Sequence, residues 1–416
     1  DLINKLHWTF DPLAKILKIS TAISVLFVLL YSKYWVENDS HLSYEAIVLI
    51  LTTLLGSWVV ISAQHMLTLF VGIELMSLPL YALVAIRSRA EDDASTLGIE
   101  ASLKYFITGS MASACLLYGF SLLFGATGHM DYSSLLTALS HIPSSQYHGV
   151  VIGIVFVVIA TGFKFGLVPF HMWVPDVYQG APLSVTLLVA TLPKLALVGM
   201  VIRLFGDVLI NNLAVWQPLF IVLGVASMIL GNGVALFQTN LPRLLGYSSI
   251  AHMGVLVLSF IVAAKQGWHA AVFYMITYVL TTSLLFGGLL QLKLTNNNIK
   301  DLAGLGKANG KLALILLLAL FSLASVPPVV GFIAKFMVLK VLLSQHLFLV
   351  ITIVLMSCIG CFYYIRVVKI MYFDEFSANV VVNKKISCNT ALLLNSLLVL
   401  LIGVMPLFLM KLIILN

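Results

Sequence analysis

The sequence predicts an all-α polytopic membrane protein with about twelve transmembrane helices. Of its 416 residues, 61% are hydrophobic and only 9% are charged, and the mean hydropathy is +1.07. The apolar residues fall into runs of about 20, the length that crosses a bilayer, separated by polar breaks. The basic residues are scattered among these breaks and form no stripe, so composition argues against nucleic-acid binding. We therefore expect the chain to lie in a lipid bilayer.

The apolar runs place the twelve expected spans along the chain. They fall near residues 14–34, 44–62, 66–86, 100–125, 149–178, 184–206, 213–236, 242–264, 269–292, 312–342, 345–372 and 391–414. The long run 44–86 is divided on length alone, because a single helix of that length would overshoot the bilayer.

Two spans, 149–178 and 312–342, are each about 30 residues long, too long for one straight crossing. Each contains central proline and a lysine: Pro169 with Lys164 in the first, and Pro327 and Pro328 with Lys335 in the second. An unpaired lysine at a helix centre costs roughly 2.5–3.5 kcal/mol, and a broken helix leaves backbone groups to be satisfied. The coincidence of both costs predicts a functional site at each break.

The two broken spans occupy equivalent positions. Without the first and last spans ten remain, and the broken span is the fourth of each five. A unit with an odd number of crossings, repeated in tandem, is inverted in the membrane. We therefore expect two inverted five-helix repeats, 44–206 and 207–373. They would be flanked by an N-terminal helix in 1–43, and by a cytoplasmic loop and a C-terminal helix in 374–416.

The loops predict the orientation. Lysine and arginine are more frequent on the side that holds residues 87–99, 237–243, 293–311 and 373–390 than on the side with both termini. Because basic loops stay in the cytoplasm, both termini are expected on the outer side.

Ionisable residues inside the spans are candidate proton carriers. They are four lysines and one deep acid: Lys104, Lys164, Lys194, Lys335 and Glu74. A buried lysine can take up and release a proton when a carboxylate near it moves. Two histidines could link the lysines through bound water, His171 beside the first break and His252 in the second repeat.

Structural interpretations of the same residues stay open. Glu74 could be an interhelical partner of Lys104 or Lys164. Lys104 could be a lysine that reaches the membrane surface, and His252 could be a core histidine with satisfied hydrogen bonds.

The cysteines give no sign of a cofactor. Cys115, Cys358, Cys361 and Cys388 are expected to be small buried hydrophobic residues, without a metal site or a redox motif. There is also no GxGxxG turn and no haem-attachment motif.

Six stretches carry a family resemblance. In order they are GIELMSLPLYALVA, LKYFITGSMASACLLYG, FKFGLVPFHMWVPDVYQGAP, LGYSSIAHMG, SVPPVVGFIAKF and YYIRVVKIMYFDE. They resemble the antiporter-like N subunit of bacterial NADH:quinone oxidoreductase, respiratory complex I, over nearly the whole chain from about residue 10. The family has fourteen helices and the match begins at the third, so its first two helices would be absent here. Lysine at position 335 and the stretch KIMYFDE favour the N subunit over its sister subunits.

The resemblance implies a multi-pass protein of the bacterial inner membrane in which 44–206 forms a proton half-channel. It implies proton transfer by Glu74, Lys164, Lys194 and Lys335, with Lys104, His171 and His252 near the hydrophilic axis. Redox energy released elsewhere would shift Glu74 and change the proton affinity of Lys164, and the proton would pass along Lys194 towards Lys335.

The same resemblance implies the partners. They would be a sister antiporter-like subunit, small membrane subunits and the lipid bilayer. NADH, FMN, iron–sulfur clusters and quinone would bind in partner subunits, with no cofactor or metal in this chain.

Three alternatives are weighed against this reading. They are the large subunit of a multi-subunit sodium/proton antiporter, a stand-alone secondary transporter and a structural scaffold. Sodium transport would call for membrane carboxylates, and this chain has one deep acid against four lysines.

Overall fold

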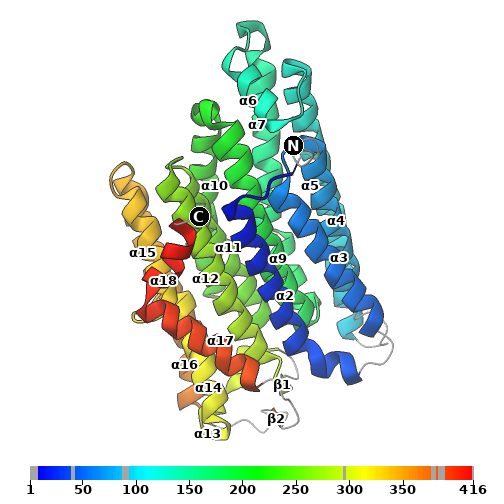
Figure 1. Cartoon of the computed structure of the whole chain (residues 1–416). Helices are drawn as coiled ribbons and strands as arrows, with labels where there is room; N and C mark the ends of the chain where they lie inside the picture. Colours follow the sequence, from blue (N-terminus) through cyan, green and yellow to red (C-terminus); the bar gives the residue numbers. More distant parts are fainter. Residues whose placement is uncertain are drawn as a thin grey trace.

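The computed structural model describes residues 8–38, 43–86, 93–293, 297–375, 381–382 and 389–414. Across these ranges the chain is almost entirely helical, and most helices run roughly along one common direction (Figure 1). Ten of the described helices are long and apolar enough to span a membrane, and a bent pair adds an eleventh. The all-α polytopic class is thus confirmed.

Each expected span corresponds to one helix or to a broken pair. The first part of the chain contains α2 (Pro12–Asn38), α3 (Ser43–Ser62), α4 (Met66–Ala85), α5 (Asp93–Thr127), α6 (Tyr132–Ser140), α7 (Ser144–Phe165), α8 (Trp173–Gly180), α9 (Leu183–Val201), the π-helix η2 (Ile202–Val208) and the 3-10 turn η3 (Ile210–Asn212). The second part contains α10 (Leu213–Ala235), α11 (Leu241–Phe260), α12 (Lys265–Leu289), η4 (Ile299–Leu302), α13 (Leu305–Ala308), α14 (Gly310–Ala324), α15 (Val330–Leu342), α16 (Leu347–Phe373), α17 (Asn389–Val404) and α18 (Pro406–Ile414). Two short strands, β1 (Leu292–Lys293) and β2 (Val381–Val382), pair antiparallel, with Leu292 opposite Val382.

The first break lies between α7 and α8, where Pro169 predicted it. Helix α7 ends because Gly166 adopts φ +74°, a left-handed conformation that favours glycine. The peptide bond before Pro169 is cis. Helix α8 resumes at Trp173 and tolerates Pro175, since a proline in the first helical turn breaks no intrahelical hydrogen bond.

The second break lies between α14 and α15, at Pro327 and Pro328. Helix α14 ends at Ser325, which takes φ +60°. The chain turns back sharply, so that a Cβ added at Gly331 would lie 1.8 Å from the Ser322 carbonyl oxygen. Only glycine fits this contact between the two half-helices.

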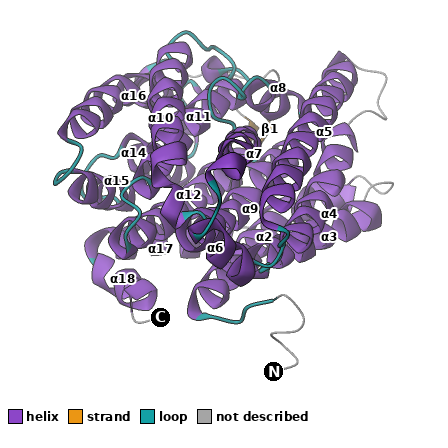
Figure 2. Ribbon diagram, turned by 90° about the horizontal axis from the view of Figure 1, so that it is seen from above, coloured by secondary structure: helices purple, strands orange, loops and turns teal. Residues whose placement is uncertain are grey.

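Two helices occupy the centre of the molecule. Seen from above, α3, α4 and α5 lie to one side, α10 and α14–α16 to the other, and α9 and α12 between them (Figure 2). Helix α9 packs against α12, and the membrane-spanning stretches of the two helices are 100% and 94% buried. Polar side chains on these helices are therefore shielded from lipid. The division into repeats at 206/207 falls within η2 and stays a prediction.

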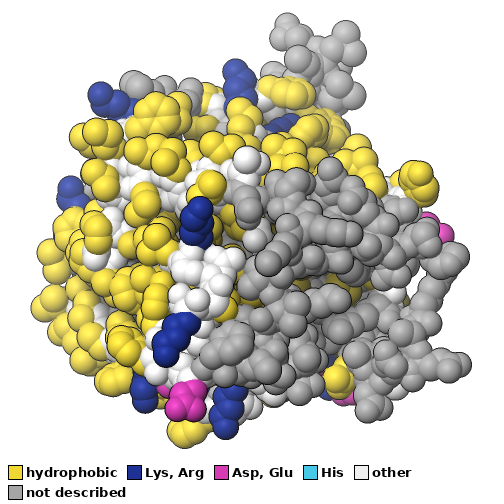
Figure 3. Space-filling view, turned by 90° about the horizontal axis from the view of Figure 1, so that it is seen from below, with side chains coloured by type: hydrophobic (Ala, Val, Ile, Leu, Met, Phe, Trp, Pro, Cys, Tyr) yellow, Lys and Arg dark blue, Asp and Glu magenta, His cyan; other side chains and the backbone are white. Residues whose placement is uncertain are grey.

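The face that carries β1 and β2 presents several Lys and Arg side chains among hydrophobic ones (Figure 3). Its predicted cytoplasmic orientation rests on the sequence argument and stays a prediction.

The structure differs from the sequence expectations at three points. Helix α6 fills part of the loop that was expected after the fourth span. The last span is bent by 85° between α17 and α18, at Met405 ahead of Pro406. The expectation that the cysteines are buried is wrong for Cys358, which is exposed on α16, while Cys115 and Cys361 are partly exposed. Cys388 lies outside the described residues.

Candidate functional site

Glu74 and Lys164 lie on the same side of α4. Ser113 of α5 donates a hydrogen bond to Glu74 Oε1. Lys164 Nζ, in the last turn of α7, donates to Ser77 Oγ at 3.1 Å. Ser77 follows Glu74 by three residues, so both side chains face the same way. Ser77 therefore places the ammonium one helical turn from the carboxylate.

No direct ion pair within 4.0 Å joins Glu74 to Lys164 or Lys104 among the described residues. The interpretation of Glu74 as the contact partner of either lysine is therefore wrong in this conformation. The Glu74 carboxylate acts on Lys164 only through space.

Lys194 is the most deeply buried of the four lysines, with 2% of its surface exposed. Its Nζ donates to Ser249 Oγ of α11 and, at 3.3 Å, to Tyr178 Oη of α8. The Tyr178 hydroxyl also donates to Ser249 at 3.2 Å. The Lys194 ammonium therefore contacts hydroxyl groups from two helices, α8 and α11.

His252 lies three residues beyond Ser249 on α11, and both of its ring nitrogens have partners. Nδ1 is 2.7 Å from Tyr274 Oη, and Nε2 is 3.2 Å from Tyr364 Oη. Tyr278 connects this histidine to Lys194: its ring centre is 5.3 Å from the His252 ring and 5.4 Å from Lys194 Nζ. His252 is thus a hydrogen-bonded core histidine, and it also lies between two lysines.

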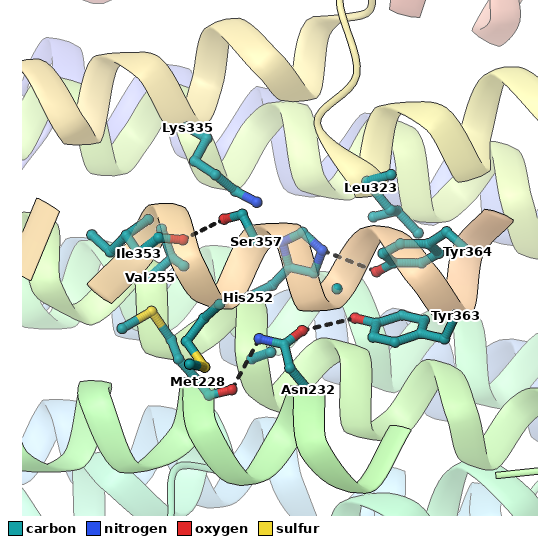
Figure 4. A pocket seen from close by; sticks show the side chains of 14 residues that line it. Met228, Asn232, His252, Val255, Leu323, Lys335, Ile353, Ser357, Tyr363 and Tyr364 are labelled. Carbon is teal, nitrogen blue, oxygen red and sulfur yellow. Dashed lines mark hydrogen bonds between the residues drawn. The ribbon is translucent and has the colours of Figure 1, made fainter. Parts of the chain in front are cut away.

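Lys335 lies at the far end of this group of side chains. It projects from α15 into a cavity of about 20 Å³ that His252, Ser357 and Tyr364 also line. Figure 4 shows its Nζ pointing towards Ser357 and the His252 ring, with Tyr364 on the other side of that ring. Lys335 Nζ donates no hydrogen bond to another described residue. A cavity of this size has room for one water molecule between Lys335 and the imidazole.

Lys104 stands apart from this chain of groups. Its side chain is 47% exposed and forms ion pairs with Glu100 at 2.6 Å and Asp176 at 2.8 Å. Asp176 pairs in turn with Arg243 at 2.8 Å. Lys104 is therefore a partly exposed, ion-paired lysine, and Asp176 joins α5 to α11 through two cations.

His171 is buried in the first break, but its Nδ1 has no hydrogen-bond partner in the described part of the chain. It makes no hydrogen bond to Lys164 or Lys194 there. Its predicted place in the relay stays a prediction.

Sequence reasoning missed the hydroxyl groups that connect the ionisable ones. They are Ser77, Ser113, Tyr178, Ser248, Ser249, Tyr274, Tyr278 and Tyr364. A usable signal was present, since polar residues recur at three- and four-residue spacing on α12 as Tyr274, Thr277, Tyr278 and Thr281. A polar stripe on a helix that is buried on all sides indicates a hydrophilic path.

The family model described as "NADH:quinone oxidoreductase/Mrp antiporter, TM" matches residues 63–360. The chain is 40% identical over 406 residues to NADH-quinone oxidoreductase subunit N of Nitrosomonas europaea, covering 97% of this chain and 83% of that protein. It is 42% identical over 407 residues to subunit N of Coxiella burnetii, with coverage of 96% and 83%.

Solved structures agree with these sequence matches. A chain of respiratory complex I from Thermus thermophilus with bound aureothin superposes with a TM-score of 0.82 at 28% identity, covering 97% of this chain and 87% of that one. A chain of the Mrp complex from Dietzia sp. DQ12-45-1b superposes with a TM-score of 0.86 at 20% identity, with coverage of 98% and 83%, and shows the shared fold. The chain is a multi-pass membrane protein that belongs to the subunit N family of NADH-quinone oxidoreductases.

Proposed function

We propose that this chain conducts protons across the bacterial inner membrane as subunit N of an NADH:quinone oxidoreductase. The proton would pass from Lys164, under the control of Glu74, through Lys194 and His252 to Lys335. The observation that carries the proposal is the hydroxyl and imidazole network that reaches from Lys194 to the Lys335 cavity.

The network suits proton transfer because its members both give and accept hydrogen bonds. Lys194 donates to Ser249, and a hydroxyl that accepts one proton can release another. Ser248 and His252 of α11 both bond to the Tyr364 hydroxyl of α16. Among the described residues no hydrogen bond joins Ser249 to this group, and the Tyr278 ring, 5.4 Å from Lys194 Nζ and 5.3 Å from the His252 ring, lies between the two. The one-water cavity then spans the remaining gap to Lys335.

The first step depends on Glu74. Because Ser77 separates the carboxylate from Lys164, a change in the position of Glu74 alters the field at the ammonium without breaking a direct ion pair. A Lys164 that loses this field releases its proton more readily. Moving one charge against 100 mV costs about 2.3 kcal/mol. A change of this size in the electrostatic interaction between the Glu74 carboxylate and the Lys164 ammonium supplies that free energy.

In this proposal the chain has no redox centre of its own. NADH, FMN, the iron–sulfur clusters and quinone bind in partner subunits, as the family's name and the complex I structure suggest. The direct neighbours are other membrane-arm subunits, including a sister antiporter-like subunit.

A second candidate is the large subunit of a multi-subunit sodium/proton antiporter. The Mrp superposition supports it at the level of fold. The proton interpretation is preferred because the described path contains buried lysines and a histidine but Glu74 as its one carboxylate, whereas sodium transport would call for membrane carboxylates.

The test is proton pumping and NADH-driven quinone reduction in membranes that carry Lys164→Met, Glu74→Ala or Lys335→Met, with assembly of the complex followed by native gel. We expect both activities to fall while the complex still assembles. Lys340→Met is the matched control, because Lys340 is an exposed lysine five residues further along α15.

Full activity of Lys164→Met and Lys335→Met would contradict the proposed relay. It would favour the alternative in which the chain is a structural scaffold and these lysines carry no protons. Sodium-dependent activity in proteoliposomes without a quinone substrate would favour the antiporter reading instead.

A further inference from the structure

Two surface cavities lie one after the other between α5 and α8, and the proton path uses neither of them. One, of about 140 Å³, is lined by charged residues at the end of α5 that holds Glu100 and Lys104. The other, of about 200 Å³, is lined by apolar residues deeper along the same helix, including Met111 and Cys115. We call the two together the α5–α8 groove.

The two cavities follow one another along both helices. On α5, Lys104 of the polar cavity precedes Thr108 of the apolar cavity by one turn, and Thr108 Oγ1 donates to the Lys104 carbonyl oxygen at 2.5 Å. On α8, Trp173 of the apolar cavity precedes Asp176 of the polar cavity by one turn. The pair of cavities therefore has one polar end and one apolar end, with the Tyr105 ring stacked on Trp173 at 4.4 Å between α5 and α8.

The depth of each end matches a lipid. The α5 span is 32 residues long, about 48 Å at 1.5 Å per residue, which covers the hydrocarbon core and both headgroup layers. Lys104 lies eight residues from its beginning at Thr96, near the boundary between headgroups and hydrocarbon. Met111 and Cys115 lie about 10 and 16 Å deeper, at the level of acyl chains.

The polar end presents both signs of charge. Lys104 and Glu100 are 47% and 58% exposed, and Arg243 and Asp176 complete the cavity. The four formal charges cancel, so an anionic ligand gains no net attraction. A ligand that carries both a phosphate and an ammonium group can bond to each: the phosphate to Lys104 and Arg243, the ammonium to Glu100.

The apolar end faces outwards. Met111 and Met172 are 70% and 73% exposed, and Trp173 forms the inner wall. Methionines adapt their shape to a flexible chain, and apart from Thr108, whose hydroxyl already donates to the Lys104 carbonyl oxygen, the residues that line this cavity are mostly apolar. Its natural occupant within a bilayer is an acyl chain.

We propose that the α5–α8 groove binds a zwitterionic phospholipid with a primary amine, of the phosphatidylethanolamine class. The phosphate and amine sit between Lys104, Arg243 and Glu100, and one acyl chain lies against Met111, Cys115 and Trp173. A quaternary ammonium has no N–H to donate, so phosphatidylcholine binds more weakly than phosphatidylethanolamine. The bound chain contacts Pro169 and so lies directly against the first helix break.

The test uses the whole membrane complex, purified through this chain and placed in nanodiscs that contain a phosphatidylethanolamine with a diazirine on one acyl chain. After irradiation, peptide mass spectrometry locates the label. We expect label on residues 108–115 and 169–173. Unlabelled phosphatidylethanolamine should displace it about tenfold more effectively than phosphatidylcholine or phosphatidylglycerol, as expected for one charge-assisted hydrogen bond, and inorganic phosphate should not displace it.

Variants separate the two ends of the groove. Met111→Trp fills the apolar end and should abolish the label, whereas Ile107→Trp changes an equally accessible residue of α5 that does not line the groove. Glu100→Gln should remove the preference for phosphatidylethanolamine over phosphatidylcholine.

Several results would overturn the proposal. They are label spread evenly over α3 and α5, equal displacement by all three lipids, or label on another protein that covers the groove. If Met111→Trp fails to assemble, the displacement series on the unmodified complex still decides between these outcomes.

Discussion

Lys164 Nζ donates a hydrogen bond to Ser77 Oγ at 3.1 Å, one turn of α4 beyond Glu74. The serine hydroxyl thus holds the ammonium near the carboxylate while keeping the two out of contact. This arrangement leaves Lys164 free to respond to Glu74, because no ion pair has to break before the proton moves.

Ser77→Ala is expected to weaken proton pumping while the complex still assembles. A hydrogen bond from a charged group contributes about 1.5–3 kcal/mol, so its loss lets Lys164 settle into another position. The measurement is the pumping rate in inverted membrane vesicles. Ser110→Ala, at an exposed position of α5, serves as the control. Unchanged pumping in Ser77→Ala would mean that the serine has no part in the relay.

Tyr364→Phe is expected to reduce pumping by about tenfold, the effect of roughly 1.4 kcal/mol on a rate. The change keeps the buried ring and removes the hydroxyl that joins Ser248 to His252. Tyr31→Phe is the control, because Tyr31 is a buried tyrosine of α2 whose hydroxyl accepts a hydrogen bond from Asn395 of α17 at 3.2 Å and belongs to a different part of the molecule. Equal loss in both variants would show that losing any buried tyrosine hydroxyl has this effect, and that the Tyr364 hydroxyl has no specific part in the path.

The sequence contained enough information to place the helices and both breaks. Hydropathy set the spans, and Pro169, Pro327 and Pro328 marked the interruptions, because a proline in a helix interior removes a backbone donor. Proline alone was not sufficient, since Pro79 and Pro193 lie inside continuous helices, and the 30-residue length of the two spans was needed as well. The burial of Lys194 and Lys335 followed from their place in apolar runs.

The partners of these residues could not be found in the same way. Ser249 approaches Lys194 across 55 positions and Tyr364 approaches His252 across 112, so those contacts depend on how α9, α11 and α16 pack. Apolar helices give little sign of which face meets which neighbour. The exposed Cys358 was misjudged for the same reason: hydropathy places it in the membrane without saying whether it faces lipid or protein.

Asp176→Asn is expected to lower the thermal stability of the complex, because it leaves Lys104 and Arg243 without their shared carboxylate. Removing one partner of a partly buried pair costs about 1–3 kcal/mol. Melting curves of Asp176→Asn, Lys104→Met and the double variant form a cycle. We expect the double variant to lose less than the sum of the two single losses. Strict additivity would show that the pair contributes no coupling.

Gly331→Ala is expected to prevent correct closure of the second helix break. The added methyl group would lie 1.8 Å from the Ser322 carbonyl oxygen, and no flexible side chain is there to move aside. Overpacking of this kind typically costs about 1–3 kcal/mol and shifts the backbone. Because Lys335 lies four residues beyond Gly331 on α15, the shift also moves this lysine relative to His252.

The measurements that test Gly331→Ala are the melting temperature of the complex and its pumping rate. Gly310→Ala is the control, since an added Cβ there meets nothing within 4 Å and alanine favours the helix. A melting temperature and a pumping rate that both match the control would show that the two half-helices can separate without cost.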